Sequence, residues 1–179
     1  MFIDLVRTRR SIRRFRPEAV EPEKVALLLE AALRAPSSRG LSPWEFIVVT
    51  DGELLRRLAR AKQHGSDFLA GAPLGVVVCA APERCDVWVE DTSIASMFLL
   101  LAAHDLGLGG CWIQIRSRRH DETRSAEEYV REVLGIPESI RVESIVAVGY
   151  PAEELPPHPR EGLLFARVHH NRFGEPYRF

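Results

Sequence analysis

Residues 91–115 read DTSIASMFLLLAAHDLGLGGCWIQI, and this stretch decides the fold class. It predicts a helix over residues 92–106, with apolar side chains on every side of the helical wheel. Gly107 ends that helix as a C-cap, and residues 111–115 form the next strand. A dinucleotide-binding fingerprint has the reverse order, because its glycines follow a strand and open a helix. The stretch therefore indicates an α/β protein and disfavours a Rossmann site.

The same helix indicates a second subunit. A helix that is apolar all round needs cover on every side. In a chain of 179 residues, its own sheet can cover one side and the same helix of another copy can cover the other. On this ground we expect a homodimer.

Helices and strands alternate around residues 91–115. The periodicity and the turn residues predict helices over residues 22–35, from Leu54 onward and over 125–134, the last with a capping box of Ser125 and Glu128. Strands are predicted over residues 46–49, 76–79 and 142–148, and the continuous apolar, valine-rich run at 76–79 is typical of a strand that is buried on both faces in mid-sheet. Strands separated by helices predict a mixed central sheet that is covered by helices. We expect a single domain over residues 1–179, in which residues 151–179 form an extended C-terminal tail.

The composition is that of an ordinary globular protein. The chain is 46% hydrophobic, and 24 basic residues against 25 acidic ones leave a net charge of -1, so no overall field favours nucleic acid or a membrane. Three cysteines without CxxC spacing, and histidines without ligand spacing, predict neither disulfides nor a metal site. The N-terminal residues contain no long apolar run, so we expect a cytoplasmic protein.

The densest charge feature is RTRRSIRRFR, residues 7–16, which holds six arginines around Ser11. One interpretation is a nucleic-acid-binding arm, although such arms usually belong to basic domains. A second is a solvated charged face of the first helix. The third, which we favour, is a phosphate site, because arginine matches phosphate oxygens with two parallel hydrogen bonds and Ser11 adds a hydroxyl donor.

Three motifs follow one another along the chain: RRSIRRF near the start, APSS followed by PW and a strand, and the apolar helix that ends in GLGGCWI; a GIP turn and VGYP follow. In this order they resemble the nitroreductase family of flavoenzymes. The resemblance runs from about Val6 to Pro151. It implies an α/β (α+β) flavoprotein fold with an intertwined homodimer and two FMN sites at the subunit interface.

The resemblance also implies roles for individual residues. Those that match the family's phosphate and flavin-edge contacts are Arg9, Arg10, Ser11 and Arg13. Pro36, Ser37 and Ser38 match the loop that reaches the flavin of the neighbouring subunit. Ile113, Gln114 and Trp112 match the strand residues that lie against the flavin ring. No catalytic side chain is implied, because the flavin N5 atom carries the chemistry.

Other positions depart from the family pattern or leave a choice open. Gly40 and Ser42 stand where family members often carry Asn and Gln before the PW motif. A late basic residue commonly completes the phosphate site, and we prefer Arg160 over Arg172. His64, near the end of the second helix, is a candidate for a contact with the flavin edge.

The implied activity is transfer of hydride from NADH or NADPH, through FMN, to a small organic acceptor such as a nitroaromatic compound or a quinone. The same scaffold also suits ring dehydrogenation, reductive dehalogenation or flavin breakdown. A flavin-binding protein without turnover, or a nucleic-acid binder that uses the arginines, are alternatives of another class.

Overall fold

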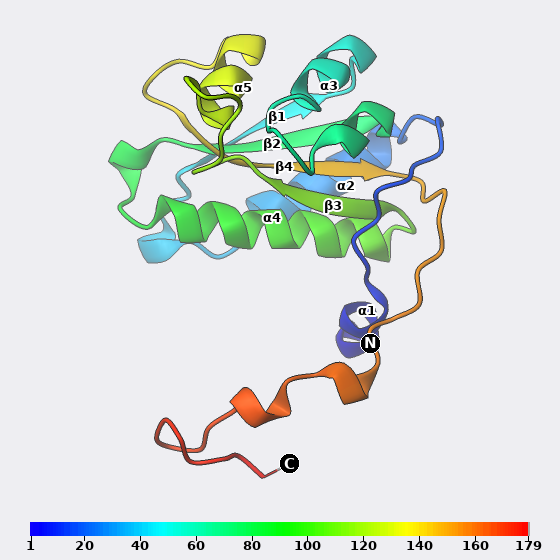
Figure 1. Ribbon diagram of the computed structural model, residues 1–179, viewed down its shortest axis with the longest axis vertical. Coiled ribbons are helices and arrows are strands. Elements are labelled where there is room, and N and C mark those ends of the chain that lie inside the picture. The colour runs from blue at the N-terminus through cyan, green and yellow to red at the C-terminus, as the bar shows by residue number, and fades with distance from the viewer. Residues whose placement is uncertain (179) are drawn as a thin grey trace.

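The computed structural model describes residues 1–178, and its centre is a four-stranded sheet (Figure 1). The strands are β1 (Trp44–Val49), β2 (Leu74–Ala80), β3 (Gly109–Gln114) and β4 (Arg141–Gly149). Their order across the sheet is β1-β2-β4-β3, and β2 is buried along its whole length. The prediction that the valine-rich strand lies in mid-sheet is confirmed.

The direction of the strands adds a detail to the predicted mixed sheet. All three strand pairings are antiparallel. A single parallel bridge joins Ser11 to Gly110 at the free edge of β3. The alternation of helices and strands along a sequence does not determine strand direction, because a connection can return the chain to either end of the sheet. The helix-covered α/β fold itself is confirmed.

Helices cover both faces of the sheet: α2 (Pro22–Leu33) and α4 (Trp88–Asp105) lie on one face, and α3 (Gly52–Leu58) and α5 (Ala126–Leu134) lie on the other. Helix α1 (Phe2–Thr8) lies apart from the sheet (Figure 1). Alternate residues of a strand point to opposite faces. Val76 and Val78 therefore pack with Leu28 of α2 and Leu99 of α4. Val77 and its neighbours on the opposite face pack against α3 and α5 (Figure 1).

Local signals placed the helix ends well. The capping box between Ser125 and Glu128 is present at the start of α5, and Gly135 ends that helix with a φ of 67°. Asp51 caps α3 by accepting a hydrogen bond from the amide of Leu54, so the helix begins two residues before the predicted Leu54. Helix α4 likewise begins at Trp88, four residues before the predicted start.

The structure of the N-terminal region disagrees with the interpretation that its six arginines form a charged face of the first helix. Helix α1 ends at Thr8, and residues 9–16 lie outside any helix. A charged face of a first helix therefore accounts for Arg7 and not for the other five arginines. Pairing with the edge of β3 and with residues 150–152 holds these residues extended instead.

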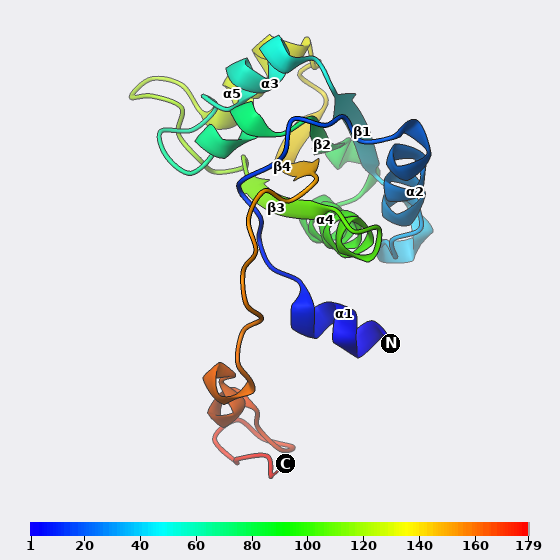
Figure 2. The same cartoon turned by 90° about the vertical axis from the view of Figure 1, so that its right-hand side faces the viewer.

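Two segments leave the body of the protein. Helix α1 buries none of its residues, and the tail that follows β4 reaches past α1 in short 3-10 turns (Figure 2). Apolar side chains stay exposed on both, including Phe2 at 68% and Leu164 at 61%. Among residues 1–178, no helix is both long and apolar enough to cross a membrane.

Candidate functional site

The extended segment 9–16, here called the arginine segment, runs beside the first residues of β3. The amide of Ile12 donates to the carbonyl of Gly110 at 3.1 Å, and Ser11 pairs with the same glycine. Further along, the amide of Arg16 donates to the carbonyl of Tyr150 at 2.8 Å. Contacts with two neighbouring strands, β3 and the end of β4, therefore fix the path of the arginine segment.

Three side chains of the arginine segment lie around Cys111 on β3. Burial raises the pKa of the Cys111 thiol, while Arg13, a hydrogen bond with Ser11 and Arg9 act in the opposite direction. Residues 9, 11 and 13 share one face of an extended chain. Arg9, Ser11 and Arg13 are thus three of the predicted phosphate contacts that the structure brings together.

Other members of the arginine segment face the C-terminal tail. The Arg10 guanidinium donates to the carbonyl of Pro156, and Arg16 Nε donates to the carbonyl of Pro151 at 3.1 Å. The Glu153 carboxylate accepts from the amides of Arg13, at 2.7 Å, and Arg14, at 3.2 Å. The structure therefore places Arg10 apart from Arg9 and Arg13, on the side of the tail.

A cavity of about 470 Å³, here called the β3 pocket, opens at the other end of the strand. It is lined by Arg13, Lys62, Gln63, His64, Gly65, Trp112, Gln114, Arg118 and Arg119. Arg13, Trp112 and Gln114 are predicted site residues. The side chain of Ile113, between Trp112 and Gln114, points to the opposite face and is buried in the core, and Ile113 is not among the described lining residues.

Sequence reasoning missed most of the polar residues of the β3 pocket. Lys62, Gln63 and Gly65 lie in the loop after α3, beside His64, and Arg118 and Arg119 follow β3. Neither loop carries a motif, so only the charge itself could have drawn attention to them. The pocket includes His64, which was a candidate for the flavin edge.

The β3 pocket is strongly electropositive. It gathers Arg13, Lys62, Arg118 and Arg119, and no acidic residue lines it. Burial lowers the pKa of Lys62, and repulsion from Arg118 lowers it further. A bound anion would relieve this repulsion, because an opposite charge nearby favours the charged form of lysine.

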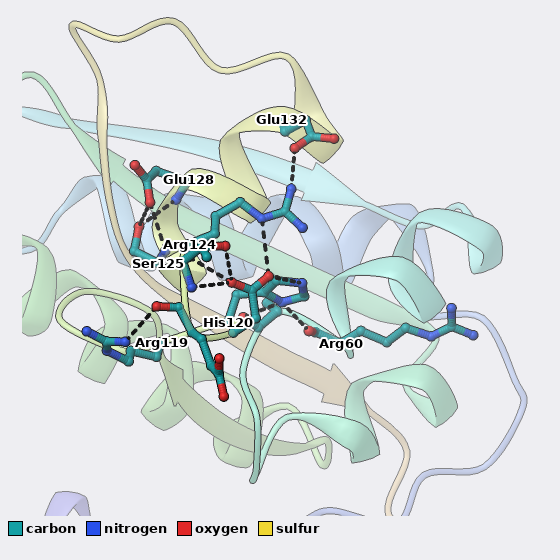
Figure 3. A network of polar contacts seen from close by, with 11 residues as sticks. Arg60, Arg119, His120, Arg124, Ser125, Glu128 and Glu132 are labelled. Carbon is teal, nitrogen blue, oxygen red and sulfur yellow. Dashed lines mark hydrogen bonds and ion pairs between the residues drawn. The ribbon is translucent and has the colours of Figure 1, made fainter.

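A network of polar contacts fixes the loop that carries Arg118 and Arg119 (Figure 3). The His120 ring stacks on Tyr129 of α5 with centroids 4.0 Å apart, and its Nδ1 lies 2.9 Å from the carbonyl oxygen of Arg60. The amide of Gln63 donates to the carbonyl of Arg119 at 3.4 Å. These contacts join the two loops that form the walls of the β3 pocket.

The predicted loop Pro36, Ser37 and Ser38 lies elsewhere in the same subunit. The amide of Ser38 donates to a carboxylate oxygen of Asp91 at 2.9 Å, in the first turn of α4. The arginine segment begins near the last turn, where the Thr8 hydroxyl lies 2.8 Å from His104 Nε2. Asp91 and His104 are thirteen residues apart on α4, which corresponds to about 20 Å.

The late arginines also lie away from the β3 pocket. Arg160 is in a 3-10 turn of the tail, where its guanidinium lies over the ring of Phe165 at 5.1 Å from the centroid. Arg172 lies further along the tail, which extends away from the sheet (Figures 1 and 2). Neither residue is among the described residues that line the β3 pocket.

Comparison with known proteins places the chain in a family. Residues 6–64 and 59–150 match the model of the nitroreductase family. An FMN-dependent nitroreductase from Clostridium difficile superposes with a TM-score of 0.94, at 46% identity over 96% of this chain and 99% of that one.

Curated relatives differ in the activity that their names state. A protein of Archaeoglobus fulgidus, provisionally named NADH dehydrogenase/NAD(P)H nitroreductase, is 40% identical over 85% of this chain and 86% of its own. An iodotyrosine deiodinase of Thermotoga neapolitana is 27% identical over 97% of this chain and 99% of its own. The extent of the family match, together with the identity to the Archaeoglobus protein, shows that the chain belongs to the nitroreductase family.

Proposed function

We propose that the protein is an FMN-dependent oxidoreductase that transfers hydride from NADH or NADPH to a small organic acceptor, such as a nitroaromatic compound or a quinone. The observation that carries the proposal is the arrangement along β3. Arg9 and Ser11 lie at the start of the strand, and an open cationic pocket with an exposed tryptophan lies at its end. A ligand with an anionic tail and a flat ring matches both ends.

The residues present suit FMN. Arginine forks and a serine hydroxyl are the donors that a phosphate dianion needs, and Arg9, Ser11 and Arg13 supply them. Gly110 and Gln114 are four residues apart, or about 13 Å along an extended strand. We propose that Arg9 and Ser11 hold the phosphate, and that the ring lies toward Trp112 and Gln114.

FMN, when bound, would supply the redox chemistry by accepting hydride from the nicotinamide and delivering two electrons to the acceptor. The chain's own task is to bind, orient and stabilise charge. Arg13 belongs both to the arginine segment and to the lining of the β3 pocket, so it is placed to stabilise negative charge that develops there. Trp112, 39% exposed, offers an aromatic surface for a planar substrate.

The lining residues also indicate which chemistry the protein does not supply. Serine, cysteine, aspartate and glutamate are absent from the residues that line the β3 pocket. We therefore propose no serine or cysteine nucleophile and no carboxylate base. Protons for the reduced acceptor would come from solvent, since the pocket is open.

We further propose that two copies form each site. The loop at Ser38 is held at the first turn of α4, and residues 36–38 are not among the described residues that line the β3 pocket of the same subunit. A second copy can bring its own loop to the β3 pocket and can cover α1 and the tail. The half-exposed Ile94 and Met97 of α4 are part of the surface that such a copy would bury. In that assembly, Arg160 would contribute to the FMN site of the partner subunit.

The purified protein tests this proposal directly. We expect a yellow dimer with FMN that NADH or NADPH bleaches without oxygen and that an acceptor then reoxidises. Parallel double-reciprocal plots are expected, because both substrates use one site in turn. A dimer that neither retains nor binds added FMN would overturn the proposal, whereas turnover confined to halogenated phenols would favour the dehalogenase alternative indicated by the deiodinase relative.

A further inference from the structure

Arg118 and Arg119 lie at the mouth of the β3 pocket, at the end opposite Ser11 and Gly110. Both are exposed and follow directly after β3, and the partly buried Lys62 lies in the facing loop. Arg9 and Ser11 already offer donors for one phosphate at the start of the strand. The cations at the mouth therefore exceed what a single FMN phosphate requires.

None of these three cations has an ionic partner among residues 1–178. The ion pairs that the structure describes involve other arginines, Lys24, His120 and the N-terminal ammonium, and none includes Lys62, Arg118 or Arg119. Arg118 donates to the Gln114 side-chain oxygen, and Arg119 donates to the backbone carbonyl of Glu122 at 2.9 Å. These contacts orient each guanidinium with neutral acceptors and leave its charge uncompensated. A guanidinium has five N–H donors, so each still has donors for a ligand.

The loop is also fixed before any ligand arrives. His120, next to Arg119, contacts the backbone of Arg60 (Figure 3). The His120 ring also stacks on Tyr129. The Asp121 carboxylate accepts from the amides of Thr123 and Arg124, both at 2.8 Å, which closes the loop on itself. A site that is held in place by its surroundings loses less entropy when it binds.

We propose that Lys62, Arg118 and Arg119 form an anion subsite that binds a carboxylate or phosphate group of the substrate. The inference rests on the proposed function and deepens it, because it names the class of substrate: a molecule whose reducible or hydride-donating group enters the β3 pocket while its anionic group stays at the mouth. Either the acceptor or the 2′-phosphate of NADPH can supply this chemistry. The cations without carboxylate partners select such a ligand over a neutral one.

The experiment compares probes that differ only in charge. Binding of 4-nitrobenzoate and 4-nitrobenzamide to the purified dimer is measured by calorimetry, and binding of NADPH and NADH in the same way. The variants are Arg118→Gln, Arg119→Gln and their double mutant. Arg118→Lys keeps the charge, and Arg57→Gln replaces an exposed arginine of α3 outside the pocket.

We expect the double mutant to bind 4-nitrobenzoate at least about tenfold more weakly than the parent protein does, because charge-assisted hydrogen bonds are lost. Its affinity for 4-nitrobenzamide should remain nearly that of the parent protein. Arg118→Lys should recover most of the difference, and Arg57→Gln should match the parent protein. A parallel loss for NADPH, with NADH unchanged, would identify the nucleotide as a source of the anion.

Two outcomes overturn the inference. The first is equal weakening of the charged and neutral probes. The second is loss of FMN from the double mutant, which would place the FMN phosphate at the mouth of the pocket. Failure of the proposed function looks different, since a protein that never reduces an acceptor can still distinguish the benzoate from the benzamide by binding.

Discussion

Ile12 lies directly against Gly109, at the point where the arginine segment meets β3. A Cβ atom on Gly109 would be 2.8 Å from Ile12 Cβ, closer than real Cβ contacts come. The clashing atom is the Cβ atom of Ile12, and rotation of this β-branched side chain about χ1 does not move it. The second glycine of GLGG is therefore needed for close approach of the arginine segment, whereas the first, Gly107, has a φ of 74° and ends α4.

We expect Gly109→Ala to displace the arginine segment. Overpacking of this kind typically costs about 1–3 kcal/mol, which thermal unfolding would detect, and FMN should dissociate more readily. Gly71→Ala is the matched control, because a Cβ there would meet nothing within 4 Å. Restoration of FMN retention in the double variant Gly109→Ala, Ile12→Gly, which removes the clashing Cβ of Ile12, would attribute the effect to this contact, and a normal single variant would contradict it.

The second prediction distinguishes among the arginines. Arg9→Ala and Arg13→Ala should each weaken FMN binding by about 1.5–3 kcal/mol, since each removes a charge-assisted hydrogen bond. Arg14→Ala is the control, because this arginine lies in the same segment, is exposed and has described hydrogen bonds only through its backbone amide and carbonyl. Equilibrium dialysis against FMN gives the affinities. Unchanged affinity in both test variants would mean that the phosphate binds elsewhere.

The third prediction concerns a residue that sequence reasoning did not select. Asp91 is 3% exposed, and its carboxylate accepts from the amide of Ser38 at 2.9 Å and from the Cys85 thiol at 3.3 Å. Asp91→Ala should leave the part-buried amide of Ser38 unsatisfied, at a cost of about 1–3 kcal/mol, and release the loop that we propose for the partner's FMN. Glu90→Gln, one residue earlier and exposed, should leave both unfolding and FMN retention unchanged.

The sequence predicted those features that depend on local physics. The capping box at Ser125 and the glycine after α4 act within a few residues, so the pattern alone is sufficient. The wall of the β3 pocket forms where the loop after α3 contacts the loop after β3. No local sequence signal predicts this contact, because the two loops are far apart in the sequence. The side-chain alternation that buries Ile113 beside the exposed Trp112 was predictable from the two-residue period of a strand.

The fourth prediction is a pH dependence of stability. Burial raises the pKa of Glu143 on β4, with Arg116 opposing and Glu127 adding repulsion, and one carboxylate oxygen has no partner. Because the folded pKa lies above the unfolded value, the ionised carboxylate destabilises the fold at high pH. This destabilisation decreases as the pH falls below the pKa of Glu143 in the folded state, and it is absent below the pKa of Glu143 in the unfolded state.

Glu143→Gln should therefore raise the melting temperature at about pH 8 and raise it less at about pH 4. Glu138→Gln, on an exposed turn, provides the control for the loss of one negative charge. A gain of equal size at both pH values would show that the titration of Glu143 is not the cause.

The last prediction tests whether the stacked pair His120 and Tyr129 positions the mouth of the β3 pocket. His120→Ala removes the ring that stacks at 4.0 Å and the contact with the carbonyl of Arg60, so the loop with Arg118 and Arg119 should lose its fixed position. We expect 4-nitrobenzoate to bind roughly tenfold more weakly, as expected when a supporting hydrogen bond is lost, while FMN retention changes little. Tyr129→Phe keeps the stacked ring and loses only the hydroxyl that donates to the carbonyl of Arg57 at 3.2 Å, so it should behave almost as the parent protein does. A second measurement tests the same loop directly. Faster amide hydrogen exchange across residues 116–125 in His120→Ala, but not in Tyr129→Phe, would show that the loop has become mobile. Unchanged exchange and unchanged 4-nitrobenzoate affinity in His120→Ala would mean that the loop holds its position without the stacked pair.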